Sequence, residues 1–181
     1  MRKELSLIDR ISHQRWTFLT IFIFLVLYSL FPMILRSNEA VTLTFAKHYM
    51  NNKWIPNDLF MNQNPGYTFL FSFIAGSLAR VLPLAVVSII IRILAILGFA
   101  YLLHQIADTF NVKFFIIIIF MFVYLPNQDI VAGEWMIILI ESKPFAYLFA
   151  LLALIYFIRK KFSKIFIFLG LSVSFHILIG I

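Results

Sequence analysis

The residues of this chain that could carry out chemistry are mostly acidic, and they gather in two polar stretches. Five of the eight acidic residues lie in the stretches 36–66 and 126–144, namely Glu39, Asp58, Asp129, Glu134 and Glu141. Carboxylates can accept a proton as general bases and can hold divalent cations. A reaction site, if the chain has one, is therefore predicted in these two stretches.

Other reactive residue types form no recognisable site. The chain has no cysteine, which excludes disulfides, thiolate metal sites and cysteine nucleophiles. His48 and His176 stand alone, without the spacing of a metal site. The sequence also lacks a glycine-rich phosphate loop, a nucleophile elbow and an HExxH helix, so soluble nucleotide chemistry has no support.

Arg92 is a cation within an apolar segment, where its charge costs about 2.5–3.5 kcal/mol on the mildest insertion scale. Three alternatives would relieve this cost. The side chain can extend to the membrane surface, pair with a carboxylate from an outside loop, or bind a lipid phosphate. We expect one of the first two.

The elements that must position these residues are apolar helices. Of the 181 residues, 62% are hydrophobic and only 13% charged, against about 25% charged in a soluble domain. A helix needs about 20 apolar residues to cross the ~30 Å hydrocarbon core of a bilayer. Several apolar segments approach this length, and six can be marked, at 17–35, 67–82, 84–104, 114–125, 145–158 and 165–181. They predict an all-α, polytopic transmembrane bundle whose main partners are membrane lipids.

The net charge of +7 indicates topology and not nucleic-acid binding, because the cations are concentrated at two places. Arg2, Lys3, Arg10 and Arg15 precede the first apolar segment, and Arg159, Lys160, Lys161 and Lys164 form a tight hinge. Short basic loops stay in the cytoplasm. We therefore predict that 1–16 and the hinge 159–164 are cytoplasmic, with outside loops at 36–83 and 126–144. A multi-pass protein of a cell membrane, such as a bacterial inner membrane, is expected.

Parity then requires one apolar segment that does not cross, because five segments separate two cytoplasmic regions. The favoured candidate is 67–82, whose small or polar residues at 68, 72, 76 and 80 share one face, as in an interfacial juxtamembrane helix. The alternative is 114–125, only about 18 Å long at ~1.5 Å per residue. About five spans result. The alternatives differ at 105–113, which the first places in the cytoplasm and the second outside.

Several short motifs of the first outside loop resemble the GT-C superfamily, membrane glycosyltransferases that use polyprenyl-phosphate sugars. The motifs are Asn38-Glu39-Ala40, Phe45-Ala46-Lys47, Trp54-Ile55-Pro56-Asn57-Asp58-Leu59-Phe60 and Asn64-Pro65-Gly66-Tyr67. The family has an acidic pair and a His-Pro-Pro-Leu-like turn here. This chain has Asn38 in place of one acid, Asn64 in place of the histidine and Gly66 in place of the second proline. Further likeness lies in Ile91-Arg92-Ile93-Leu94 with Gly98 and Tyr101, and in 151–158 followed by Arg159.

The resemblance implies roles for individual residues. Glu39 matches the family's catalytic acid, as a general base or a ligand of a divalent cation. Glu141 fits the second acidic position, with Glu134 as the alternate. Arg92 and Lys143 would bind the substrate phosphate.

Structural roles are the alternatives for both acids. Glu39 can complement the dipole of a short helix over 38–50, worth about 0.3–1 kcal/mol. Glu141 can pair with Lys143 at the head of a span.

Three functions remain open from these residues. The first is transfer of a sugar from a lipid-linked donor on the outer face. The second is a transporter or flippase subunit, which needs ionisable residues deep in several spans, and only Arg92 qualifies. The third is a non-catalytic membrane protein. Because the last apolar segment reaches Ile181 without a polar exit, we expect a single transmembrane domain over 1–181 that is the N-terminal portion of a larger protein.

Overall fold

A computed structural model describes residues 7–30, 37–130 and 140–180. The regular secondary structure within these residues is helical, without strands. The helices are α1 (Leu7–Leu30), α2 (Ser37–Met50), α3 (Phe69–Ala79), α4 (Leu84–Phe110), α5 (Phe114–Tyr124), α6 (Ser142–Ile158), α7 (Phe162–Phe175) and α8 (Ile177–Gly180). Two 3-10 helices, η1 (Gly66–Thr68) and η2 (Leu125–Ile130), connect them. The prediction of an all-α class is confirmed.

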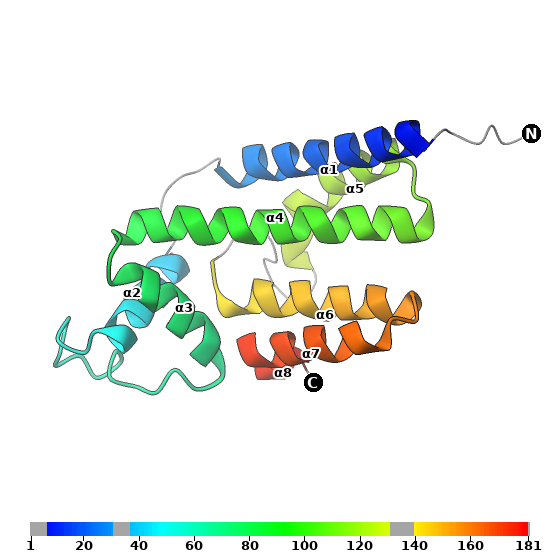
Figure 1. Cartoon of the computed structure of the whole chain (residues 1–181). Coiled ribbons are helices and arrows are strands. Elements are labelled where there is room, and N and C mark those ends of the chain that lie inside the picture. The colour runs from blue at the N-terminus through cyan, green and yellow to red at the C-terminus, as the bar shows by residue number, and fades with distance from the viewer. Residues whose placement is uncertain (1–6, 31–36, 131–139, 181) are drawn as a thin grey trace, which may run out of the picture.

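Four helices, α1, α4, α6 and α7, run side by side; α4 and α6 point in one direction, and α1 and α7 point in the opposite direction (Figure 1). α2 and α3 cross one end of this bundle, which we call the α2–α3 end. At the opposite end, called the hinge end, α4 turns into α5 and α6 turns into α7. The first outside loop and the basic hinge of the sequence prediction thus lie at opposite ends.

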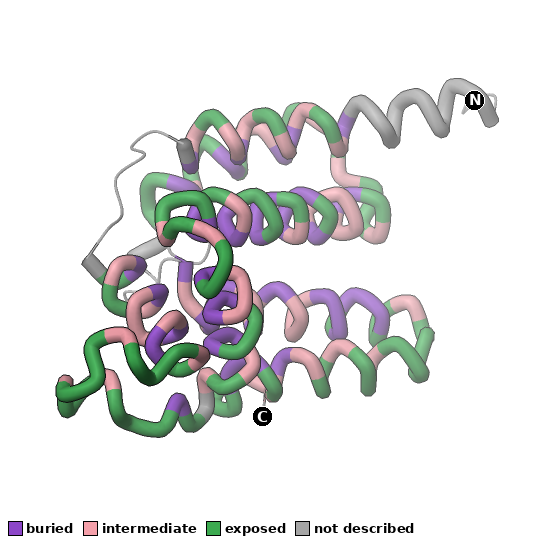
Figure 2. The backbone as a smooth tube through the Cα atoms, turned by 60° about the vertical axis from the view of Figure 1, so that its left-hand side comes forward, coloured by how far each residue is buried: buried purple, intermediate pink, exposed green. Residues whose placement is uncertain are grey.

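The core lies between α1, α4 and α6, and it consists of apolar side chains. Ile21 and Leu25 of α1 and Ile96 of α4 are 0% exposed. The same core contains Leu148 and Leu152 of α6. Figure 2 shows buried residues along α6 and mainly exposed ones along α7. The apolar surface of α7 is therefore available to an apolar environment.

Small residues allow close contact between helices. A Cβ atom added at Gly76 of α3 would lie 2.1 Å from the carbonyl oxygen of Ala46 in α2. Ser72 on the same face is also buried, whereas Phe69 and Phe73 on the other faces are about half exposed. The predicted face of small residues in 67–82 therefore packs against α2, as small residues do in membrane helix pairs.

One helix in the described part of the chain, the 27-residue α4, is long and apolar enough to cross a membrane. The other apolar helical stretches within those residues have 10–17 residues. The predicted segment 165–181 is broken at His176, whose backbone is extended (φ −158°, ψ 106°). A single candidate span is thus established, and the multi-pass arrangement stays a prediction.

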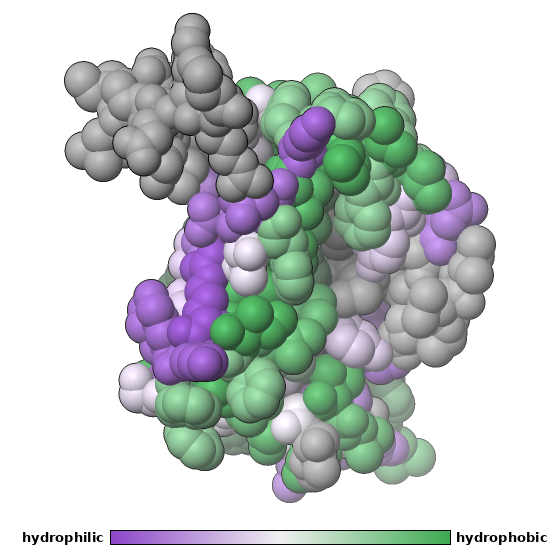
Figure 3. Space-filling model, turned by 90° about the vertical axis from the view of Figure 1, so that its right-hand side faces the viewer, coloured by the Kyte–Doolittle hydropathy of each residue, from purple (hydrophilic) through white to green (hydrophobic). Residues whose placement is uncertain are grey.

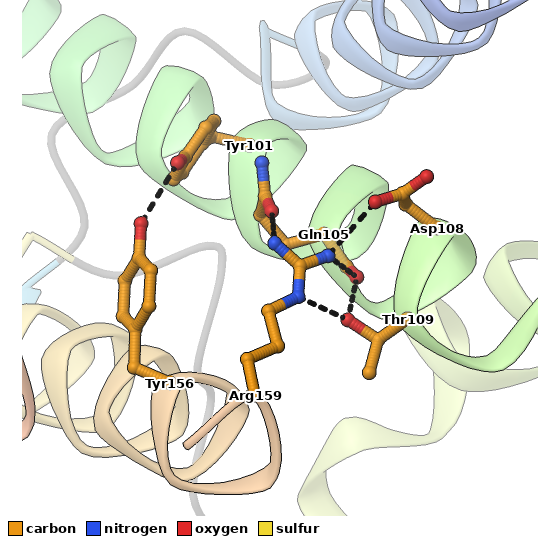
Figure 4. A network of polar contacts seen from close by, with 6 residues as sticks. All are labelled: Tyr101, Gln105, Asp108, Thr109, Tyr156 and Arg159. Carbon is orange, nitrogen blue, oxygen red and sulfur yellow. Dashed lines mark hydrogen bonds and ion pairs between the residues drawn. The ribbon is translucent and has the colours of Figure 1, made fainter. Parts of the chain in front are cut away.

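At the hinge end, Arg159 connects the end of α6 to the end of α4 (Figure 4). Its Nε donates to Oγ1 of Thr109 (2.9 Å), and its Nη2 lies 3.0 Å from Oδ2 of Asp108. Nη1 donates to Oε1 of Gln105. Residues 105–113 therefore lie at the same end as the hinge 159–164, where Figure 3 shows a band of hydrophilic residues.

Candidate functional site

A cleft of about 420 Å³ lies at the α2–α3 end, where the two predicted outside loops meet. One wall comes from α2, the loop 51–65 and the start of α3, and the other from the start of α6 and the break between α7 and α8. Its polar lining includes Asn38, Asn64, Glu141, Lys143 and His176. The structure therefore joins the two stretches in which the sequence predicts a site.

The turn at Asn64-Pro65-Gly66 shapes the first wall. Oδ1 of Asn64 accepts a hydrogen bond from the backbone N–H of Gly66 (2.9 Å), and the hydroxyl of Thr68 donates to the carbonyl of Pro65 (2.9 Å). Gly66 has φ +52°, a conformation that glycine adopts without steric cost. The two residues before Gly66, Asn64 and Pro65, line the cleft.

The second wall is the beginning of α6. Glu141 is extended just before the helix (φ −141°, ψ 175°), and no side chain caps this helix end. The dipole at the beginning of a helix favours an anion. Lys143 adds a positive charge at the same place. The arrangement suits a phosphate group.

Glu39 and Arg92 do not line the cleft but pair with each other behind it. Nη2 of Arg92 lies 2.5 Å from Oε1 of Glu39, and its Nη1 donates to the carbonyl of Ser29 (2.9 Å). Glu39 is 0% exposed and Arg92 5% exposed. Of the three alternatives for Arg92, the structure has the pairing with a carboxylate, which offsets the cost of two buried charges.

This pairing sets the surroundings of the two residues to which the resemblance gives roles at the site. Glu39 joins α1, α2 and α4 through Arg92 and is not at the surface, where a base or metal ligand would meet substrate. Arg92 is likewise engaged and does not face a substrate phosphate. In place of Glu39, its neighbour Asn38 reaches the cleft.

The remaining predicted acids divide into three groups. Glu141 is the one carboxylate among the described residues that line the cleft. Asp58 stabilises its own loop, since its Oδ1 accepts hydrogen bonds from two backbone N–H groups, at 2.9 and 3.0 Å. Glu134 lies outside the described residues, and the side chain of Asp129 does as well.

A divalent cation finds too few ligands in this part of the chain. No group of three acidic, histidine or cysteine side chains occurs within residues 7–30, 37–130 and 140–180. Glu141 alone does not make a cation site. The described residues therefore do not fit the metal that the resemblance allows, and we derive no step through one.

His176 is a cleft residue that the sequence did not identify as functional. It is 4% exposed and lies where the chain breaks between α7 and α8. An imidazole can exchange a proton near neutral pH. In the sequence, His176 could have been noticed as a histidine within an otherwise apolar segment. Only the fold shows that this segment breaks at the cleft, which Lys143 also lines.

An apolar groove of about 410 Å³ adjoins the cleft, between α3, α4, α6 and α7. It contains Phe71, Phe145 and Phe175, whose ring centroids lie 6.2 Å (Phe71–Phe145) and 5.2 Å (Phe145–Phe175) apart. Ser72 and His176, the neighbours of two of these rings in the chain, line the cleft instead. A cavity with several polar and charged side chains thus borders an apolar one across a layer of aromatic rings, a geometry that suits an amphiphile.

Comparisons with models of known protein families, with curated proteins and with solved structures find no match to this chain.

Proposed function

We propose that the chain is a multi-pass membrane protein, similar to GT-C glycosyltransferases, that binds a lipid-linked sugar phosphate at the outer face. The observation that supports this proposal is the cleft, with its charged and polar side chains, beside the apolar groove. The phosphate and sugar would occupy the cleft, and the lipid tail would occupy the groove.

The membrane arrangement rests on lengths and charges. α6 has 17 residues, about 26 Å at ~1.5 Å per residue, close to the ~30 Å hydrocarbon core. Phe166 and Leu178 expose 75% and 77% of their surface, which lipid would cover. The basic hinge would lie in the cytoplasm together with the N-terminus, and the cleft would then open on the outer side.

The ligand assignment rests on complementary chemistry. The uncapped first turn of α6 and Lys143 provide positive potential for a phosphate. The groove is lined mainly by aliphatic and aromatic side chains, including Leu94, Leu148 and Phe149. Burial of a hydrocarbon tail there contributes about 0.8 kcal/mol per CH₂ group.

The proposed reaction needs one proton acceptor and stabilisation of one leaving group. Glu141 would accept the proton of an acceptor hydroxyl group, while the oxygen of that hydroxyl group forms a bond to the anomeric carbon of the sugar. The bond from that carbon to the phosphate oxygen breaks, and the electron pair leaves with the polyprenyl phosphate. Lys143 and the first turn of α6 would stabilise the growing negative charge.

Photo-crosslinking tests the binding step. Membranes that contain the full chain are irradiated with a photoreactive polyprenyl phosphate, and Lys143→Ala should lower labelling at least about tenfold. Lys164→Ala, which removes a lysine at the hinge end, is the matched control and should label normally. Unlabelled polyprenyl phosphate should compete, whereas inorganic phosphate should not. Equal labelling of the two variants would refute the proposed site.

The transfer step has a separate test. Glu141→Gln keeps the shape of the side chain but removes the base, so it should retain labelling and lose sugar transfer by about 100-fold or more. Transfer is measured with a radiolabelled lipid-linked sugar. Undiminished transfer by this variant would exclude Glu141 from the reaction, and labelling without transfer in the unmodified chain would favour a binding protein.

A further inference from the structure

His48 lies near the end of α2, and both nitrogens of its ring face oxygen atoms of the loop 51–65. Nδ1 lies 2.5 Å from the backbone oxygen of Trp54, and Nε2 lies 3.1 Å from Oδ1 of Asn62. The residue is only 3% exposed. The ring therefore joins α2 to two separate points of one loop.

The orientation of the Asn62 amide is set by its other contacts. Its Nδ2 donates to the backbone oxygens of Pro56 (2.9 Å) and Asp58 (2.8 Å). A rotation of the amide by about 180° would place Oδ1 against these two carbonyl oxygens. The atom that faces His48 is therefore the amide oxygen, which can only accept.

The two contacts need two protons on the ring. The backbone oxygen of Trp54 also only accepts, and a neutral imidazole has a single N–H, whereas the imidazolium ion donates from both nitrogens. Loss of a proton leaves a bare ring nitrogen against an oxygen lone pair in a buried position.

The charged groups of the loop have contacts of their own. Lys47, which precedes His48, places its ammonium 4.6 Å from the centroid of the Trp54 ring. Asp58 accepts two backbone N–H groups of the loop. Lys53 is exposed.

The helices packed on α2 contribute no charge to this site. α3 contains no charged residue, and Arg80, which follows it, is exposed. On α4, Arg92 pairs with Glu39, near the other end of α2. Hydrogen-bond geometry, and not an ion pair, thus couples the proton of His48 to the loop.

The same loop forms a wall of the cleft. Phe60 and Gln63 line the cleft, and the Phe60 ring lies 5.9 Å from the ring of Phe45 on α2. We propose that protonated His48 clasps the loop 51–65 against α2, and that loss of the proton releases this wall and widens the cleft. The proposal goes beyond the proposed function, because it holds whatever ligand the cleft binds.

The position of the loop can be measured with a nitroxide spin label. The chain has no cysteine, so Gln63→Cys gives one label site in the cleft wall, and Lys113→Cys gives a control site at the hinge end. In lipid bilayers, the mobile fraction of the label at position 63 should rise about tenfold between pH 5 and pH 9, as expected for the loss of one buried hydrogen bond. The label at position 113 should not change.

The histidine itself is followed by ¹⁵N NMR of the unmodified chain, with His48→Gln used to assign its signal. Both nitrogens should have imidazolium shifts at low pH, and the ring and the loop label should change with the same midpoint. Label mobility in the His48→Gln variant should not depend on pH. Because this variant could fail to fold, the unmodified chain decides: different midpoints, or a mobility that stays constant from pH 5 to 9, would overturn the proposal.

Discussion

Two arginines connect α4 to neighbouring helices, one at each end of the bundle, and their surroundings differ. At the α2–α3 end, Arg92 is 5% exposed and contacts one carboxylate, that of Glu39, and one carbonyl oxygen. At the hinge end, the side chain of Arg159 is 22% exposed and shares its donors among three residues of α4. One arginine thus depends on a single buried partner, and the other has several accessible ones.

The difference in exposure changes what each pair contributes. If a buried partner is removed, water cannot replace it, and the remaining charge is left in an apolar environment. A partly exposed arginine keeps other acceptors or gains water, so the loss of one carboxylate has little effect. Similar ionic contacts therefore predict opposite sensitivities to mutation at the two ends.

The largest expected effect is at the buried pair. Glu39→Ala should lower the free energy of unfolding by about 3–5 kcal/mol, because Arg92 is left buried without its carboxylate. The double variant Glu39→Leu with Arg92→Leu removes both charges and should recover most of this loss. Unfolding in mixed detergent micelles measures both. A double variant as unstable as the single one would contradict this account of the pair.

A smaller effect is expected where α2 and α3 are in closest contact. Gly76→Ala should cost about 1–3 kcal/mol, because its Cβ would lie 2.1 Å from the Ala46 carbonyl oxygen and the two helices must separate. Gly170→Ala in α7 is the control, since no neighbouring atom lies within 4 Å of its Cβ position. It should leave stability unchanged or raise it slightly. Thermal unfolding of the two variants, compared side by side, provides the test.

The smallest effect is predicted for Asp108 at the hinge end. Asp108→Asn should lower stability by less than about 1 kcal/mol, because its side chain is 47% exposed and Arg159 retains Gln105 and Thr109. The difference from the unmodified chain should shrink further at high salt. A loss comparable with that of Glu39→Ala would remove the contrast between the two ends.

Much of the helical organisation follows from local sequence. The predicted helix over 38–50 corresponds to α2, and the segment 84–104 corresponds to α4, which continues to Phe110. Errors occur at the ends: the first helix begins at Leu7, ten residues before the predicted apolar segment. A helix can continue into polar residues where backbone hydrogen bonds and capping allow it. The ends of an apolar segment therefore do not predict the ends of the helix.

The site was only partly predictable. The two polar stretches with most of the acids do meet, and Glu141, Lys143 and Asn64 reach the cleft. His176 was missed, because periodicity in a uniformly apolar helix does not show which face is covered. Glu39 was assigned to the membrane surface on the resemblance, and its burial depends on contacts with Arg92 in a distant helix. The proton-dependent contacts of His48 were also missed, since they depend on the path of an irregular loop.

The sequence by itself determined that the chain is helical, strongly apolar and basic in two short segments, because composition and charge placement are properties of segments. Only the tertiary structure decided that Glu39 pairs with Arg92, which lies 53 residues away in the chain. Apolar helices can pack in many registers of similar energy, and a single buried charge selects among them by its need for a partner. The same packing decided which acid lies in the cleft and which lies behind it.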